Sequence, residues 1–358
     1  MTRVYRYKVC SRSFQISPLS FSLVFHADLI GIMPEASTKE DVIIVGSGIA
    51  GCVLAARLHE KNKDPKILVI EAGKDVSNHP LTSSPFACFT AHYSELDWAY
   101  STIPQLHLGN RACYAAAGKG LSGEGATNYG TWIRGNATDY KLWAKQVDDS
   151  QWSYDALLPY FRKTEIFRGD SEEPDATVHG LNGPVHNYSI SASSASRKSP
   201  LQDHLRTAWT PIGVQEIADG NSGSPLGLSE LVENWHNSQR QLVSQAYPLS
   251  GVEVMTEELV RRVILEERNG KIIATGVELA SGAPISASKE IIISAGAYRT
   301  PQVFMLSGIG PEEELEKHGI SVLVSSPVGK EFHDHHPVCQ WWKLRHPDLH
   351  PSAGSPKW

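Results

Sequence analysis

The chain has 358 residues, enough for one large or two ordinary domains, and 41% of them are apolar, as in a typical globular protein. Its formal net charge is −6 and its pI is near 6.2, with no extended basic stripe, which argues against nucleic acid as a partner. No run of roughly 18 or more apolar residues occurs, so the sequence predicts no transmembrane helix and no membrane partner.

The cysteines predict neither a disulfide framework nor a metal centre. They are five in number, scattered, and without C-x-x-C spacing. Cys52 is expected to be a small buried thiol. The densest group of ligand-type side chains, residues 333–336 with Cys339, matches no familiar ligand spacing, so no metal is predicted.

Residues 1–38 form an N-terminal extension that differs in composition from the rest. It begins with four basic residues, has no acid before Asp28, and carries an apolar patch at 21–25. Serines and a proline interrupt that patch, which disfavours a signal peptide. An untargeted or wrongly assigned start, with translation from Met33, and an organellar transit segment remain as alternatives. We expect a cytoplasmic protein, and secreted or organellar locations stay open.

The segment that organises the chain is residues 41–73. An apolar strand is expected at 41–45, a G-x-G-x-x-G turn follows at Gly46, Gly48 and Gly51, then a helix to about Lys61 and a strand at 66–70. In such a βαβ unit the first glycine permits the tight turn, the second lets backbone amides reach a pyrophosphate, and the third lets the helix pack on the strand. Glu71 ends the second strand, where a carboxylate binds a ribose hydroxyl. The sequence therefore predicts a dinucleotide site.

A second glycine cluster spans residues 118–132 and precedes a helical pattern at 137–146. So many glycines predict backbone packed against a large flat ligand, with an ordinary surface loop as the alternative. Further along, strands are expected at 252–254, 260–266, 272–279 and 290–294. Thr300-Pro301 is expected to start a helix that Gly308 to Pro311 stops, and a second helix is expected at 312–318.

Four motifs in this order resemble the glucose–methanol–choline (GMC) family of FAD-dependent oxidoreductases. They are the glycine turn with EAG, the stretch GKGLSGEGATNYGTWIRGNATDYKLWA with WSYDALLPYFRKTE, the stretch SAGAYRTPQVFMLSGIGPEEELEKHGISVLV, and VGKEFHDHHP. The resemblance covers the chain from about residue 40 to its end. It implies an α/β (α+β) protein with a Rossmann-like FAD-binding domain and a second, interleaved and incomplete substrate-binding domain.

The resemblance also implies domain boundaries. The FAD-binding domain is expected at residues 39–135 and 241–336, and the substrate-binding domain at 136–240 and 337–358. Family members continue well past the D-H-P segment, so we expect a chain truncated before the C-terminal part that supplies the catalytic His. No residue here matches the family's catalytic base, and the catalytic residues are left unassigned.

FAD rather than NAD is the cofactor that the resemblance implies. The turn would cradle the pyrophosphate, Glu71 the adenosine ribose, Asn128 to Trp132 would lie along the flavin, and the backbone of Val260 would meet the adenine. The residues expected to bind FAD are Gly46, Ser47, Gly48, Ile49, Gly51, Glu71, Ala72, Ser122, Asn128, Gly130, Thr131, Trp132, Val260 and Ala295. Glu124 departs from the family, which places small residues beside the diphosphate, and Glu331 stands where Asn is common.

The implied activity is oxidation of an alcohol, with hydride passing from the carbinol carbon to flavin N5 and electrons then passing to oxygen or another acceptor. The substrate would be a small-molecule alcohol, with a secondary metabolite as one candidate. The first alternative is a catalytically inactive, truncated FAD-binding protein of the GMC type. An NAD-dependent dehydrogenase would share the glycine turn, but the later family motifs argue against it.

Overall fold

The computed structural model describes residues 23–26, 39–83, 87–169, 174–193, 201–237, 239–332, 334, 343 and 345. The chain divides into two compact units that alternate along the sequence. Unit 1 comprises Met1–Thr82, Phe86–Asn128 and Leu242–Asp334, and unit 2 comprises Ser83–Pro85, Tyr129–Gln241 and His335–Trp358. The boundaries drawn from the sequence remain a prediction.

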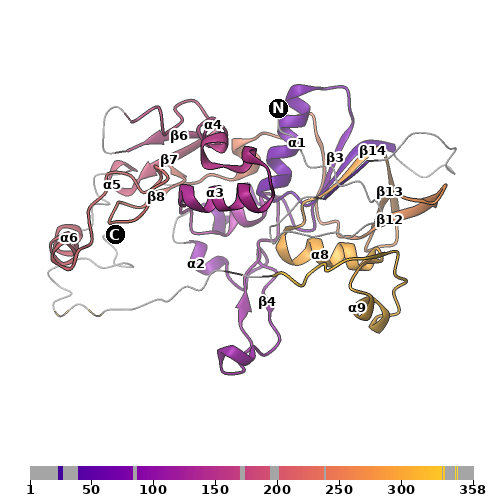
Figure 1. The fold of residues 1–358 in the computed structure, drawn as a ribbon. Helices are drawn as coiled ribbons and strands as arrows, with labels where there is room; N and C mark the ends of the chain where they lie inside the picture. The colour runs from indigo at the N-terminus through magenta and orange to yellow at the C-terminus, as the bar shows by residue number, and fades with distance from the viewer. Residues whose placement is uncertain are drawn as a thin grey trace. The chain divides into compact units, whose positions relative to one another are not determined.

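Unit 1 is built on a mixed sheet whose centre is parallel (Figure 1). Its parallel part runs in the order β11 (Glu253–Met255), β3 (Ile67–Ile70), β2 (Lys39–Val45), β14 (Pro284–Ile293). Parallel strands buried on both faces read as continuous apolar runs, which is how β3, with the sequence ILVI, reads. The α/β class expected from the sequence is confirmed.

The sheet continues beyond β14 as an antiparallel meander of β13 (Lys271–Leu279) and β12 (Val260–Arg268). The turn between these two strands is Asn269-Gly270, both with positive φ, as a tight hairpin requires. A short strand, β1 (Leu23–His26), pairs antiparallel with the end of β14. The sequence predicted no strand there, because the segment is short and Ser20 and Ser22 precede it.

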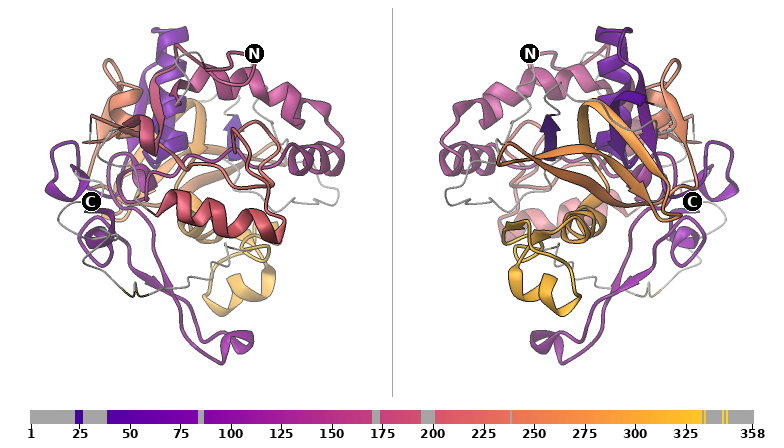
Figure 2. Two further views of the ribbon diagram at one scale, coloured as in Figure 1. Left: turned by 90° about the vertical axis from the view of Figure 1, so that its left-hand side faces the viewer. Right: turned by 90° about the vertical axis from the view of Figure 1, so that its right-hand side faces the viewer.

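Two helices cover opposite faces of the parallel sheet. Helix α1 (Ile49–Lys61) packs through Ala55 against Val42 and Ile44, whereas α8 (Gly296–Leu306) packs through Val303 and Phe304 on the other face. Figure 2 (right) shows α1 above the sheet and α8 below it. Successive side chains of β2 point to opposite faces of the sheet, so they enter two separate hydrophobic cores.

Shorter elements complete unit 1. They are η1 (Pro80–Thr82), α2 (Ala87–Ala91), β4 (Tyr100–Ser101), η2 (Leu106–Leu108), β5 (Tyr114–Ala115), η3 (Gly123–Ala126), α7 (Val243–Ala246), β15 (Ile309–Gly310), α9 (Glu312–Lys317) and β16 (Val324–Ser325). Strands β4 and β5 pair antiparallel at the base of a long hairpin (Figure 1). Residues 77–110 are therefore mostly loop, interrupted by short elements.

Two predicted boundaries are wrong. Strand β14 begins at Pro284, whereas the sequence placed its start at residue 290. Helix α8 begins at Gly296, with Ala295 as its N-cap, and not at Thr300. Proline often marks a first helical turn, which is why the sequence favoured Thr300-Pro301. Here Pro301 lies inside the helix, where the missing N–H removes the bond to the carbonyl of Ala297. The helix tolerates this loss because its buried face packs on the sheet.

Unit 2 combines helices with a three-stranded sheet. The sheet runs in the order β6 (Glu165–Arg168), β7 (Val185–Ser189), β8 (Val232–Glu233), and two helices precede it, α3 (Ala137–Gln146) and α4 (Tyr154–Thr164). Asn136 and Ser153 cap these helices through their side chains. The other elements are η4 (Ser150–Trp152), α5 (Ile190–Ser193), α6 (Gln202–Trp209), η6 (Thr210–Ile212), β9 (Trp235–His236) and β10 (Gln239–Arg240). In the described part of the chain, no helix has the length and apolarity needed to cross a membrane.

Candidate functional site

Two strand–turn–helix crossings lie side by side at one edge of the unit 1 sheet. Strands β2 and β14 are parallel neighbours that end in register, with Val45 opposite Ile293. Ser294, which follows β14, donates from its backbone N–H to Val45 O (2.8 Å) and from Oγ to Gly46 O (2.8 Å). The N-termini of α1 and α8 therefore both start from the carboxyl ends of adjacent strands, where open α/β sheets bind their ligands.

The turn from β2 to α1 needs its glycines for different reasons. Gly46 has φ +92°, and a Cβ there would lie 2.6 Å from Ser294 O. A Cβ on Gly51 would lie 2.0 Å from Gly46 O, so α1 can pack on the turn only without a side chain. A Cβ on Gly48 would meet no atom within 4 Å. Gly46 and Gly51 thus serve packing, while Gly48 borders open space.

The N-terminus of α1 faces that open space without a side-chain cap. Its N-cap is Gly48, and the next residue, Ile49, is 49% exposed although it is large and apolar. Helix α8 also lacks a side-chain cap at Ala295. The first amides of a helix have no intrahelical acceptor and carry the positive end of the helix dipole. Both helix ends therefore suit a phosphate group.

Glu71 holds the glycine turn in place from the end of β3. Its carboxylate is buried and accepts hydrogen bonds from Ser47 N (2.9 Å), Ser47 Oγ (2.7 Å) and Gly73 N (2.9 Å). An ionised carboxylate offers about four acceptor positions, so these three bonds leave room for one further donor. A ribose hydroxyl is such a donor, and its binding to Glu71 stays a prediction.

The second glycine cluster lies directly against the first turn. Ser122 has φ +94° and donates its N–H to Ser47 O (3.0 Å), and a Cβ on Gly123 would lie 2.7 Å from Gly48 Cα. The sequence did not point to Ser244, yet its Oγ lies 2.9 Å from Ser122 Oγ. No sequence motif marks Ser244, because it lies 122 residues from Ser122 along the chain and only the fold brings the two together.

Cys52 is fully buried beneath the turn, as the sequence predicted, and its Sγ donates to Ser47 O (3.0 Å). Burial raises the pKa of this thiol to about 12. The thiol is therefore neutral at physiological pH, and its role here is packing.

Glu124, the departure noted in the sequence, is engaged by its own loop. Its carboxylate accepts from Gly118 N (2.6 Å) and from Thr127 Oγ1 (3.4 Å). The side chain is exposed, and the neighbouring protein atoms that partly desolvate the carboxyl raise its pKa. The hydrogen bond from Gly118 N therefore stabilises the negative charge of the carboxylate within its own loop.

The remaining predicted residues of unit 1 surround the same strand ends. The segment leading into β12 bonds to the segment that carries Glu71 and Ala72: Glu257 N donates to Gly73 O and Glu258 N to Glu71 O, both at 2.9 Å. This pairing brings the start of β12, where Val260 is buried, to the end of β3. Asn128 ends the unit 1 segment Phe86–Asn128 and donates its N–H to Glu124 O.

The other predicted residues belong to unit 2. Gly130, Thr131 and Trp132 extend its sheet beside β8, with Trp132 N donating to Val232 O (2.8 Å) and Asn234 N to Gly130 O (2.8 Å). Gly130 has φ +74°, and a Cβ there would lie 2.2 Å from Trp235 Nε1. Contacts within unit 2 therefore fix the backbone of residues 130–132.

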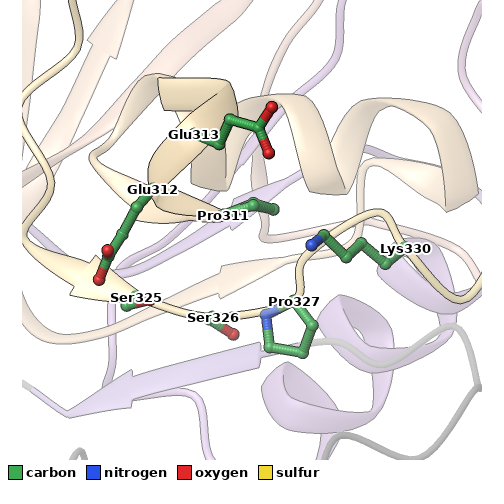
Figure 3. A pocket seen from close by; sticks show the side chains of 7 residues that line it. All are labelled: Pro311, Glu312, Glu313, Ser325, Ser326, Pro327 and Lys330. Atoms are coloured by element: carbon green, nitrogen blue, oxygen red, sulfur yellow. The ribbon is translucent and has the colours of Figure 1, made fainter. Parts of the chain in front are cut away.

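A shallow pocket of about 310 Å³ lies elsewhere in unit 1, between the start of α9 and the chain after β16 (Figure 3). Glu312, Glu313 and Lys330 are its charged residues. It adjoins β15 and α9, which follow the C-terminal end of α8, whereas Ala295 caps the opposite end of that helix. The two glutamates also disfavour a phosphate there, so we do not assign the cofactor to it.

Among the described residues, no group of three or more His, Cys, Asp or Glu side chains could hold a metal ion. The histidine cluster noted in the sequence, His333, His335 and His336 with Cys339, lies outside the described residues.

The comparisons with known proteins decide the family. The profile described as GMC oxidoreductase matches residues 40–337. This chain belongs to the GMC oxidoreductase family. It is 38% identical over 317 residues to the GMC-type oxidoreductase acuG of Aspergillus aculeatus, covering 88% of this chain and 56% of that protein. It is 33% identical over 307 residues to the oxygen-dependent choline dehydrogenase of Brucella anthropi, covering 83% and 53% respectively.

Solved structures of GMC oxidases share the fold. A pyridoxine 4-oxidase from Mesorbium loti superposes with a TM-score of 0.72 at 29% identity, over 80% of this chain and 55% of that one. A mutant formate oxidase of Aspergillus oryzae, described by the effect of its mutation on FAD modification, gives a TM-score of 0.73 at 28% identity, over 81% of this chain and 51% of that one. The resemblance drawn from the sequence is thus confirmed, and the FAD chemistry of these relatives agrees with the cofactor it implied. The chain spans about half the length of the relatives it matches.

Proposed function

We propose that this chain binds FAD at the glycine turn and is the cofactor-holding part of an alcohol-oxidising GMC oxidoreductase. The observation that carries the proposal is the uncapped N-terminus of α1, with Gly48 bordering open space and Ile49 exposed beside it. A dinucleotide pyrophosphate fits such a site in charge and size.

In this proposal each part of the cradle has a separate task. Backbone amides at the start of α1 bind the pyrophosphate, and Gly48 allows them to come close. Glu71 keeps Ser47 in place and accepts a ribose hydroxyl, and the buried backbone at Val260 borders the adenine. Ser122 and Gly123 hold the turn from the other side, with Ser244 fixing Ser122.

FAD, when bound, supplies the hydride acceptor for oxidation of an alcohol to a carbonyl compound. By the family resemblance, Gly130, Thr131 and Trp132 would lie along the flavin, and within unit 2 their backbone is held by hydrogen bonds to Val232 and Asn234. No described residue is assigned as the base that removes the hydroxyl proton. The substrate would be a small-molecule alcohol, and oxygen or another acceptor would take up the electrons.

The test begins with the purified full chain and added FAD. A yellow protein that keeps its flavin through gel filtration, and whose absorbance bleaches anaerobically with one of a panel of alcohols including choline, would support the proposal in full. Flavin retention without bleaching by any alcohol would support only an FAD-binding protein without turnover. A colourless protein that ignores FAD but enhances NADH fluorescence would contradict the proposal.

A further inference from the structure

A buried ionic network in unit 2 lies next to the backbone of Trp132 and Arg134. At its centre is the carboxylate of Glu165, which is fully buried. Arg134, which is also buried, donates from Nη2 to Glu165 Oε1, and Asn187 Nδ2 donates to Oε2 (3.0 Å). Gly180 N adds a further bond to Oε1 (3.1 Å).

His179 joins this carboxylate to a second one. Its Nδ1 lies 2.9 Å from Glu165 Oε1, and its Nε2 lies 3.1 Å from Asp219 Oδ2. A neutral imidazole has only one N–H. At one of the two contacts the lone pair of the ring nitrogen would therefore face a lone pair of the carboxylate oxygen. The doubly protonated ring donates at both ends. Its positive charge, with that of Arg134, also balances the two carboxylates.

The carboxylates around His179 favour this charged form, whereas burial and the positive charge of Arg134 oppose it. The ring is 3% exposed and stacks on Phe167 with ring centroids 3.5 Å apart. Asp175, whose backbone carbonyl accepts from His179 N, adds a third carboxylate nearby. Burial acts to lower the pKa of His179, but the hydrogen bonds and charges of Asp219 and Glu165 outweigh it and raise the pKa above its usual range.

Asp219 connects His179 to a buried asparagine, Asn221, by a hydrogen bond. Its Oδ1 accepts from Asn221 N (2.7 Å), and Asn221 is 3% exposed. The Asn221 side chain then makes two bonds to one short segment: Oδ1 accepts from Arg134 N (2.8 Å), and Nδ2 donates to Trp132 O (3.1 Å). His179, Asp219 and Asn221 thus form a continuous chain of bonds that ends on the backbone of Trp132 and Arg134.

We propose that the imidazolium of His179, acting through Asp219 and Asn221, is a positioning residue for the backbone of Trp132 and Arg134. Loss of one proton from His179 removes a donor from this chain of bonds, so the segment loosens as the pH rises past the raised pKa of His179. The inference rests on the proposed function only in that Trp132 is taken to lie along the flavin.

Hydrogen exchange of the full chain without FAD, followed by mass spectrometry over a pH series, tests the proposal. After correction for intrinsic exchange, we expect protection of residues 130–134 to fall about tenfold through one alkaline step, the equivalent of one hydrogen bond. Protection of β2 and β3 in unit 1 should show no such step. A pH-independent protection of residues 130–134 would overturn the proposal, and this wild-type measurement needs no variant.

Two variants sharpen the result. Asp219→Asn keeps the Oδ1 acceptor for Asn221 but favours a neutral His179, so the step should move to lower pH. His179→Gln carries no titrating group and should abolish the step. A step that persists unchanged in a folded His179→Gln protein would contradict the role of His179. A separate titration with FAD tests the proposed function independently. The pH-dependent step in hydrogen exchange is expected whether or not FAD binds, so failure of one proposal can be told from failure of the other.

Discussion

The glycine-turn cradle of unit 1 and the ionic network of unit 2 hold backbone in place by opposite means. Around Gly46 and Gly51 the backbone is fixed because side chains are absent and main-chain atoms touch. Around Trp132 and Arg134 it is fixed by a buried carboxylate, a guanidinium and an imidazole. The first arrangement fails when volume is added, and the second fails when charge is changed. Four predictions separate these two modes, from the largest effect to the smallest.

Removing the central charge of the network should have the largest effect. Glu165→Gln would leave the buried Arg134 without its counter-charge and His179 with Asp219 alone, at a cost of about 3–5 kcal/mol in the free energy of unfolding. Urea unfolding of the full chain measures this cost. Glu60→Gln, which breaks an exposed pair with Arg57, is the matched control and should cost less than about 1 kcal/mol. Equal effects of the two substitutions would contradict the central position of Glu165.

Adding one methyl group to the cradle should have the next largest effect. In Gly51→Ala the new Cβ meets Gly46 O and Ser294 Oγ, so α1 must shift, at a cost of roughly 3 kcal/mol. Because no charge changes, the loss should be the same at every pH between the acid and alkaline limits. Urea unfolding at several pH values checks this, and a pH-dependent loss would contradict a purely steric cause.

Acid should loosen unit 2 before the cradle. Burial acts to raise the pKa of Glu165, but the hydrogen bond from His179 and the positive charge of Arg134 outweigh burial and lower this pKa. Burial also acts to raise the pKa of Asp219, and the hydrogen bond with His179 outweighs it in the same way. A carboxyl with a depressed folded pKa stabilises the protein fully above its unfolded pKa of about 4, and this contribution is lost as the pH falls through the folded value. Hydrogen exchange below about pH 4 should therefore show β6 and β7 losing protection before β2 and β3. The reverse order would show that the bonds to the Glu71 carboxylate matter more to the cradle than its close main-chain contacts do.

The smallest effect concerns Glu124, an exposed acid beside the cradle. Glu124→Gln removes a negative charge near the proposed pyrophosphate site, and since this side chain is exposed we expect FAD to bind about fivefold more tightly, or about 1 kcal/mol. The gain should shrink in high salt. Isothermal titration with FAD measures it, and unchanged affinity would mean that the bond from Gly118 already holds the carboxylate away from the ligand.

The same contrast explains what the sequence could reveal. The strands and helix around Gly46 were predicted almost to the residue, because apolar runs and glycine spacing are local signals. The start of α8 was missed because Pro301 is a local signal that tertiary packing overrides.

The ionic network could not be predicted. Its members are far apart along the chain: Arg134 is 31 residues from Glu165, and His179 is 40 from Asp219. Nothing in the periodicity of the sequence reports such a pairing. Asn221 was also missed, since a single asparagine in a polar loop gives no sign that its amide will be buried against Trp132.

The most direct test of the cradle is the affinity of FAD for Gly48→Ala. The new methyl group enters the open space before α1 at an ordinary φ of −63°, so the free energy of unfolding should change by less than about 0.5 kcal/mol. Ala56→Gly, which weakens the same helix by about 1 kcal/mol away from the turn, is the control for stability. We predict FAD binding at least tenfold weaker in Gly48→Ala and unchanged in Ala56→Gly. Equal FAD affinity in Gly48→Ala and wild type would contradict the account.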